Sequence, residues 1–99
     1  EYGISVPREF QTPGGNIAKN LYSFKNIRIF DGDGTNPEEA SQLLSDSVQY
    51  VRERKGPALI HLTVPRLNGH SYQDNQAYKS EERLKREQEN DPLEKLKDL

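Results

Sequence analysis

Hydrophobic residues fall into three stretches of this chain, and their spacing differs from one stretch to the next. Residues 27–30 and 58–64 are rich in apolar and β-branched side chains, which predict two short strands. Between them, apolar residues recur at helical spacing, which predicts an amphipathic helix over about 37–55. The residues of this helical stripe are Ala40, Leu43, Leu44, Val48 and Val51.

Local signals mark where the predicted helices begin and end. Asn36 is a capping side chain, and Pro37 follows at the first helical position, where its fixed φ suits the helix. Gly56 and its neighbours end that helix. Ser80 and Asp91 are capping residues that predict two further short helices near the C-terminus.

The order strand, helix, strand predicts a βαβ unit with parallel strands and a right-handed crossover. The first strand is expected to end in the turn Asp31-Gly32-Asp33-Gly34. The second strand is apolar at nearly every position, so it is expected to be covered on both faces. Since two strands do not make a stable open sheet, we expect a piece of a larger α/β domain.

Composition narrows the functional classes. The chain has 99 residues, of which 31% are hydrophobic and 30% are charged, so it can bury only a modest core. The net charge of −2 argues against binding to nucleic acid. No apolar run approaches the roughly 20 residues of a membrane span. Cysteine is absent, which excludes thiolate catalysis and Cys-ligated metals and fits a reducing, cytoplasmic location.

Candidate chemistry is concentrated in the loop that follows the second strand. Arg66 offers a fork of donors suited to phosphate, and His70 can act as acid, base or donor near neutral pH. Gly69 lets the backbone approach a ligand closely. Ligands bind at such strand ends in open α/β sheets. The residues alone leave two alternatives open: a ligand site, or an Arg and a His that tie down the loop.

Two other motifs are weaker. The run from Asp31 resembles the start of a calcium loop, but Thr35, Asn36 and Gln42 occupy positions where that loop needs an acid, a glycine and a glutamate. His61 lies within the apolar strand, so we interpret it as a hydrogen-bonded core histidine rather than a metal ligand.

The His-bearing run and the residues around it resemble one known family. Its motifs here are Arg66-Leu67-Asn68-Gly69-His70-Ser71, Asp74, Tyr78, Lys79-Ser80-Glu81-Glu82, Asp91-Pro92-Leu93, Tyr2-Gly3-Ile4-Ser5 and Gly56-Pro57. Together they resemble the α-subunit portion of thiamine-diphosphate-dependent 2-oxoacid dehydrogenases, the decarboxylating first components of the pyruvate and branched-chain 2-oxoacid dehydrogenase complexes. The resemblance covers essentially the whole chain and implies a piece of a parallel-sheet thiamine-diphosphate-binding fold.

The resemblance implies roles for four residues. His70 would be the loop histidine near the cofactor's reacting centre, implicated in passing the acyl group to a lipoyl arm. Arg66 would contact the diphosphate. The backbone carbonyl of Tyr2 would bind Mg²⁺, and Ile4 would lie against the aminopyrimidine ring.

Ser71 and Ser80 fall where eukaryotic relatives are phosphorylated. A phosphate on Ser71 would place about −1.5 to −2 charges beside a diphosphate site and disorder the loop.

The resemblance also divides the chain. Residues 1–26 would form the cofactor-side loop region, 27–64 the βαβ unit, 65–80 the active-site loop and 81–99 the C-terminal helices. The implied partners are a β-type subunit or domain, the lipoyl domain of the acyltransferase component and a 2-oxoacid substrate.

The family's cofactor motif opens with Gly-Asp-Gly and closes with paired Asn, and both would precede Glu1. We therefore expect the isolated chain to be inactive. The segment Thr12-Pro13-Gly14-Gly15 favours a branched-chain 2-oxoisovalerate type over a pyruvate type. The alternative hypothesis is a non-catalytic α/β interaction fragment whose loop Arg and His are structural.

Overall fold

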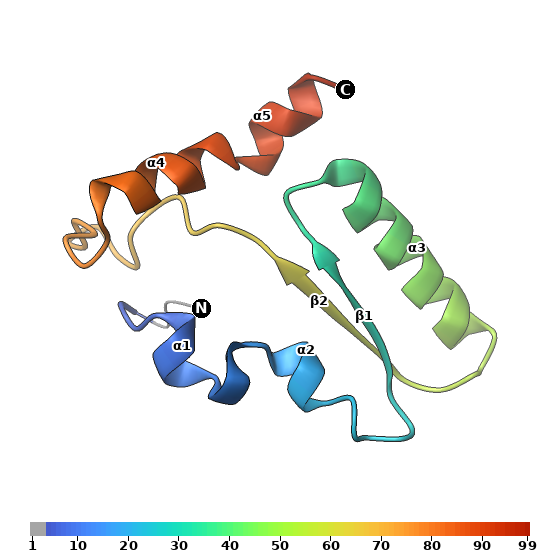
Figure 1. Cartoon of the computed structure of the whole chain (residues 1–99). Coiled ribbons are helices and arrows are strands. Elements are labelled where there is room, and N and C mark those ends of the chain that lie inside the picture. The colour runs from blue at the N-terminus through green and yellow to red at the C-terminus, as the bar shows by residue number, and fades with distance from the viewer. Residues whose placement is uncertain (1–3) are drawn as a thin grey trace.

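The computed structural model describes residues 4–99, which form short helices around a two-stranded sheet (Figure 1). In chain order the elements are α1 (Arg8–Gln11), the 3-10 helix η1 (Pro13–Gly15), α2 (Ile17–Asn20), β1 (Arg28–Asp33), α3 (Pro37–Arg52), β2 (Ala58–Thr63), α4 (Glu81–Glu89) and α5 (Pro92–Lys97). The described part of 1–26, predicted as a loop region, thus contains three short helices.

The strands β1 and β2 are hydrogen-bonded neighbours and run parallel, with Arg28 opposite Ala58 and Asp33 opposite Thr63. The predicted α/β class is therefore confirmed. The predicted end of the first strand was wrong, because β1 continues through Gly32 to Asp33. A Cβ atom at Gly32 would overlap side chains of α3, so glycine here allows close packing of helix on strand rather than a turn.

Helix α3 begins where the sequence predicts. The side-chain oxygen of Asn36 accepts hydrogen bonds from the N–H groups of Glu38 and Glu39, at 3.1 and 3.2 Å. The helix ends at Arg52, earlier than the predicted residue 55, and Arg54 then adopts a left-handed conformation with φ of 56°. The predicted caps of α4 and α5 are also present, since Ser80 and Asp91 accept hydrogen bonds from backbone N–H groups.

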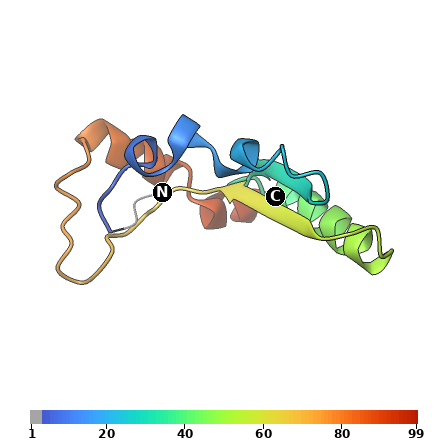
Figure 2. The ribbon, with the colours of Figure 1, turned by 90° about the horizontal axis from the view of Figure 1, so that it is seen from below.

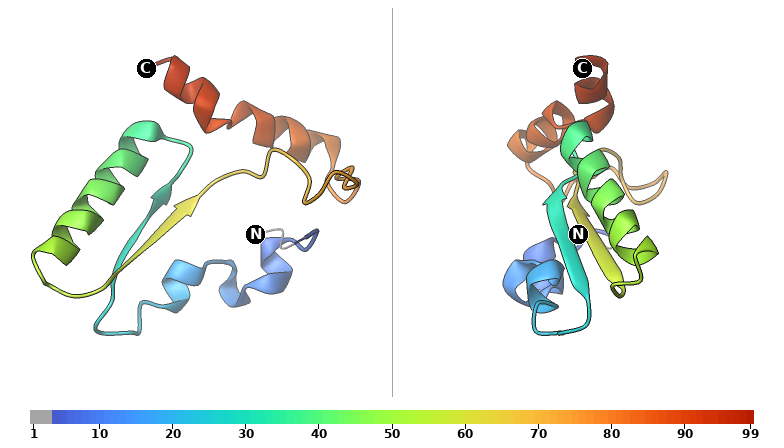
Figure 3. Two further views of the ribbon diagram at one scale, coloured as in Figure 1. Left: turned by 180° about the vertical axis from the view of Figure 1, so that it is seen from behind. Right: turned by 90° about the vertical axis from the view of Figure 1, so that its right-hand side faces the viewer.

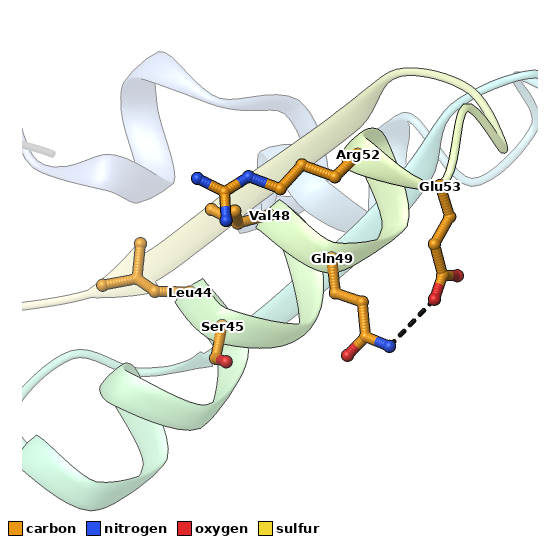
Figure 4. A pocket seen from close by; sticks show the side chains of 6 residues that line it. All are labelled: Leu44, Ser45, Val48, Gln49, Arg52 and Glu53. Atoms are coloured by element: carbon orange, nitrogen blue, oxygen red, sulfur yellow. Dashed lines mark hydrogen bonds between the residues drawn. The ribbon is translucent and has the colours of Figure 1, made fainter.

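The apolar stripe of α3 divides between two faces. Ser47 is buried, and Tyr50 meets Phe30 of β1 edge to face, with ring centroids 6.3 Å apart. Leu44 and Val48 are each 45% exposed and lie on the outer face of the helix. Figure 4 shows both side chains lining a hollow on this face. Val51 is also exposed, so only Ala40 and Leu43 of the five residues in the predicted stripe are partly buried.

Helices α3 and α2 lie on opposite faces of the sheet (Figures 2 and 3). Ala18 of α2 is fully buried, whereas Ile60 in β2 remains 37% exposed. Both faces of the second strand thus have a helix against them, as predicted, but the covering is incomplete within residues 4–99.

Packing in the described part of the chain is open. Its radius of gyration is 15.8 Å, whereas about 13 Å is typical of a compact chain of this length. None of the large hydrophobic residues among residues 4–99 is fully buried. None of the helices within this range is long and apolar enough to cross a membrane. The sparse core fits a piece of a larger α/β fold.

Candidate functional site

The predicted active-site loop, residues 65–80, follows the carboxyl end of β2 and leads into α4 (Figure 1). Helices α4 and α5 then pass beyond the carboxyl ends of both strands (Figure 3). This is the edge at which ligands bind in open α/β sheets.

The structure brings Arg66 and Ile4 together although they are 62 positions apart. The Arg66 Nη1 donates to the carbonyl oxygen of Ile4 at 2.9 Å, and the Tyr78 hydroxyl lies 3.5 Å from the same oxygen. Ile4 has φ of 67°, an unusual conformation for a β-branched residue. Two of the predicted cofactor-binding residues are thus adjacent. The third, Tyr2, lies outside the described residues.

His70 lies in the exposed loop tip, residues 69–75, and Asp74 organises this turn. The carboxylate of Asp74 accepts hydrogen bonds from the N–H groups of His70 and Gln76, at 2.7 and 2.9 Å, and from the Tyr78 hydroxyl at 2.8 Å. The bond from the His70 N–H, followed by that from Gln76, lowers the pKa of Asp74. The loop tip is therefore shaped by an ionised carboxylate. The imidazole of His70 has no hydrogen-bonding partner assigned among residues 4–99.

Four residues hold the two ends of the loop together, and we call them the loop frame: Arg66, Gln76, Lys79 and Glu87. The Lys79 Nζ donates to the Arg66 carbonyl oxygen and to Gln76 Oε1, both at 2.9 Å, and forms an ion pair with Glu87 of α4. The side chain of Lys79 is 0% exposed and that of Glu87 is 13% exposed. The loop frame is therefore centred on an ion pair that is largely buried.

A cavity of about 520 Å³ lies between α1, the end of β2 and α4. Arg8, Arg66 and Arg83 line it from three different segments, beside His61 and the carboxylates of Glu9 and Glu87. Glu87 is already engaged by Lys79 and, at 3.4 Å, by Arg83. Three guanidinium groups around one cavity suit an anionic ligand. His70 is not part of its lining.

His61 lies opposite Asp31 in the strand register, and its Nδ1 is 2.7 Å from the Asp31 carboxylate. Asn16, the N-cap of α2, also reaches this carboxylate, at 3.5 Å. The hydrogen bond with His61 is the main cause that lowers the pKa of Asp31. The interpretation of His61 as a hydrogen-bonded histidine is therefore confirmed.

Acidic residues at the end of β1 have structural partners. Asp33 accepts a hydrogen bond from the Thr35 N–H at 2.8 Å, so it organises the turn after the strand. Within residues 4–99, no group of three acidic, His or Cys side chains is arranged to hold a metal ion.

The two serines named from sequence occupy different positions. The Ser80 hydroxyl accepts from the Arg83 N–H at 3.2 Å and caps α4. Ser71 is exposed in the loop tip, and its carbonyl oxygen accepts from the Asp74 N–H at 3.0 Å. Their phosphorylation stays a prediction.

Sequence reasoning assigned no role to Asp74, Lys79 or Glu87. An aspartate two residues before Gln76 is a recognisable turn signal, so the role of Asp74 could have been found from spacing. The burial of Lys79 could not have been predicted from the sequence, because lysine is almost always exposed unless it is paired. Its partner lies eight residues away on another element.

Comparison with known proteins places these features in a family context. The family model described as dehydrogenase E1 component matches residues 1–99. The pyruvate dehydrogenase E1 component subunit alpha of Rickettsia felis is 34% identical over 93 residues, which cover 94% of this chain and 28% of the relative. The corresponding subunit of Rickettsia prowazekii is 32% identical over 99 residues, covering all of this chain and 30% of the relative.

A differently named relative is the 2-oxoisovalerate dehydrogenase subunit alpha of Bacillus subtilis. It is 29% identical over 96 residues, which cover 94% of this chain and 28% of the relative. The chain therefore spans less than a third of the length of these curated relatives. No solved structure matches it significantly.

Proposed function

Because this chain belongs to the dehydrogenase E1 component family, we propose that it is part of the α-type half of a thiamine-diphosphate-dependent 2-oxoacid dehydrogenase. The proposed enzyme decarboxylates a 2-oxoacid and transfers the acyl group to a lipoyl group. A β-type subunit or domain and the lipoyl domain of an acyltransferase are its proposed partners.

One observation carries this proposal: the contact between Arg66 and Ile4 beside the arginine-lined cavity. The family resemblance assigns both residues to the cofactor, and they come from segments far apart in the chain. Their meeting at the carboxyl edge of a parallel sheet supports a common ligand for both. If Arg66 only stabilised the loop, two further guanidinium groups around the same cavity would not be needed.

The donor set fits a diphosphate. Arg66, with Arg8 and Arg83 nearby, offers planar donors that pair well with phosphate oxygens in a partly enclosed cavity. Thiamine diphosphate, when bound, would supply the nucleophilic carbon and the electron sink for decarboxylation. Mg²⁺ binding by the Tyr2 carbonyl stays a prediction.

In this proposal, residues of the chain itself bind the cofactor and transfer protons. Arg66 holds a phosphate oxygen, and its hydrogen bond to the Ile4 carbonyl positions the N-terminal segment. His70 is exposed on a turn fixed by Asp74, so its imidazole can donate or accept a proton at an approaching acyl acceptor.

The substrate belongs to one of two classes. The segment from Thr12 to Gly15 favours a branched-chain 2-oxoacid, whereas relatives named pyruvate dehydrogenase favour pyruvate. Steady-state rates with pyruvate and with 3-methyl-2-oxobutanoate, measured on the complete enzyme, decide between them.

The test uses the complete α-type chain with its β-type partner. Arg66→Ala removes a charge-assisted hydrogen bond, so the Kd for thiamine diphosphate should rise by roughly 10- to 100-fold. His70→Ala should slow acylation of a lipoyl domain more than decarboxylation assayed with an artificial electron acceptor. Calorimetry and the two rate assays measure these effects.

Arg52→Ala is the matched control, since Arg52 is an exposed arginine on α3 (Figure 4) that does not line the arginine-lined cavity. It should leave cofactor affinity unchanged. If Arg66→Ala leaves affinity unchanged and His70→Ala leaves lipoyl acylation unchanged, the loop is structural and the interaction-fragment hypothesis is correct.

A further inference from the structure

The buried Lys79 has no role in the function proposed above, yet it is among the most enclosed charged side chains of the described residues. Burying an ammonium group is unfavourable unless it is paired and hydrogen-bonded. Lys79 meets this requirement with three acceptors, one for each N–H donor of its ammonium group.

Those acceptors come from three parts of the chain. The Arg66 carbonyl lies at the start of the loop, Gln76 lies near its end, and Glu87 lies on α4. A single ammonium group therefore joins the start of the loop to the helix that follows it. Gln88 adds a parallel link, because its side-chain amide donates to the Leu67 carbonyl at 3.2 Å.

The connection made by Lys79 fixes the position of Arg66. Its backbone carbonyl is held by Lys79, and its guanidinium group donates to the Ile4 carbonyl. With the backbone of Arg66 held by α4, the reach of its side chain towards the cavity is also restricted. A ligand-binding group held in this way loses less conformational freedom when a ligand binds.

We propose that Lys79 is a positioning residue that fixes Arg66 for the diphosphate of the cofactor, an inference that rests on the proposed function. Glu87 compensates the charge of Lys79, and Gln76 completes its coordination. Lys79 itself does not line the cavity, so it acts through Arg66 and not by contact with the ligand.

The experiment compares Lys79→Met and Lys79→Arg in the complete enzyme. Lys79→Met keeps much of the apolar stem but removes the donors, so amides of residues 67–78 should exchange hydrogen faster. The Kd for thiamine diphosphate should rise about tenfold, since a small displacement of a binding group is costly. The rate at saturating cofactor should stay within about twofold of wild type. Lys79→Arg, which keeps the charge, should recover much of the affinity.

Lys97→Met is the matched control, because Lys97 is 69% exposed and pairs only locally with Glu94 of its own helix. It should change neither exchange nor affinity. Unchanged affinity in Lys79→Met overturns the proposal, whether or not the loop exchanges faster.

Gln76→Asn provides a second test in case the Lys79→Met enzyme does not fold or does not bind its β-type partner. Gln76 has φ of 58°, a conformation that asparagine tolerates, and the shorter side chain withdraws the acceptor while the ion pair remains. A smaller rise in Kd in the same direction is expected, and no rise contradicts the proposal.

Arg66→Ala, measured in parallel, distinguishes a failure of the proposed function from a failure of the role proposed for Lys79. If the wild-type enzyme does not bind thiamine diphosphate, or if Arg66→Ala does not weaken binding, the proposed function fails. If Arg66→Ala weakens binding and Lys79→Met does not, only the role given to Lys79 fails.

Discussion

The loop frame and the loop tip are both organised by a carboxylate, but in different environments. In the loop frame, Glu87 meets Lys79 away from solvent. In the loop tip, Asp74 is half-buried and accepts hydrogen bonds from the backbone N–H groups of His70 and Gln76. The buried cluster holds Arg66, whereas the exposed turn carries His70. The buried part of the loop thus presents the proposed binding residue, and the exposed part presents the proposed catalytic residue.

The largest expected effect comes from Gly69→Ala. A Cβ atom at Gly69 would overlap the Asp74 carbonyl oxygen, which is backbone and cannot move aside as a side chain can. The loop tip should open, at a cost of about 1–3 kcal/mol. Hydrogen exchange of residues 69–76 measures this, with amides of α3 as the internal reference.

Gly15→Ala provides the control for Gly69→Ala. A Cβ atom at Gly15 meets nothing within 4 Å, but the residue has φ of 73°, so the substitution tests backbone conformation without a clash. Protection of the loop tip should stay unchanged in this variant. Wild-type exchange in Gly69→Ala would show that the tip is less tightly packed than the structure indicates.

A smaller and reversible effect is expected in acid. The folded pKa of Asp74 lies below its ordinary value, so its contribution is complete above the unfolded pKa and is lost as pH falls through the folded pKa. After correction for intrinsic rates, protection of the His70 and Gln76 amides should be constant near neutral pH. It should decrease below about pH 4.

Asp74→Asn separates this titration from general acid unfolding. The amide does not titrate in this range and is a weaker acceptor, so the same amides should exchange faster at pH 7 and show a flatter pH profile. A profile identical to that of wild type would assign the acid response to another group.

The smallest expected effect is that of Ser71→Glu. The added charge lies in the Asp74 turn, which the family resemblance places beside the diphosphate, but it is exposed and therefore screened. Cofactor affinity should fall by about two- to fivefold at low salt and recover at high salt. Ser45→Glu, on the outer face of α3, should have no effect. A loss of affinity that persists at high salt would point to disrupted packing instead of charge repulsion.

Sequence predicted most reliably what depends on neighbouring residues. The start of α3 at Pro37 follows from the bond between Asn36 and the next two N–H groups. The starts of α4 and α5 likewise follow from Ser80 and Asp91. These signals act within one helical turn, so no knowledge of the fold was needed.

Prediction failed where a distant contact decided the outcome. Gly32 resembles a turn residue, but it lies within β1 because α3 packs against it. Leu44 and Val48 follow the helical apolar pattern, yet no described element covers them. The resemblance placed Arg66 and Ile4 at one site. Their direct hydrogen bond, and the burial of Lys79, could be known only from the folded chain.

The pair formed by His61 and Asp31 has a consequence for folding accuracy. The two residues face each other in the strand register, and their side chains meet on the face of the sheet that α2 covers. A slip of one position would send one partner to the opposite face and leave a carboxylate without its imidazole. The pair therefore stabilises the observed register of the two strands relative to a register shifted by one residue.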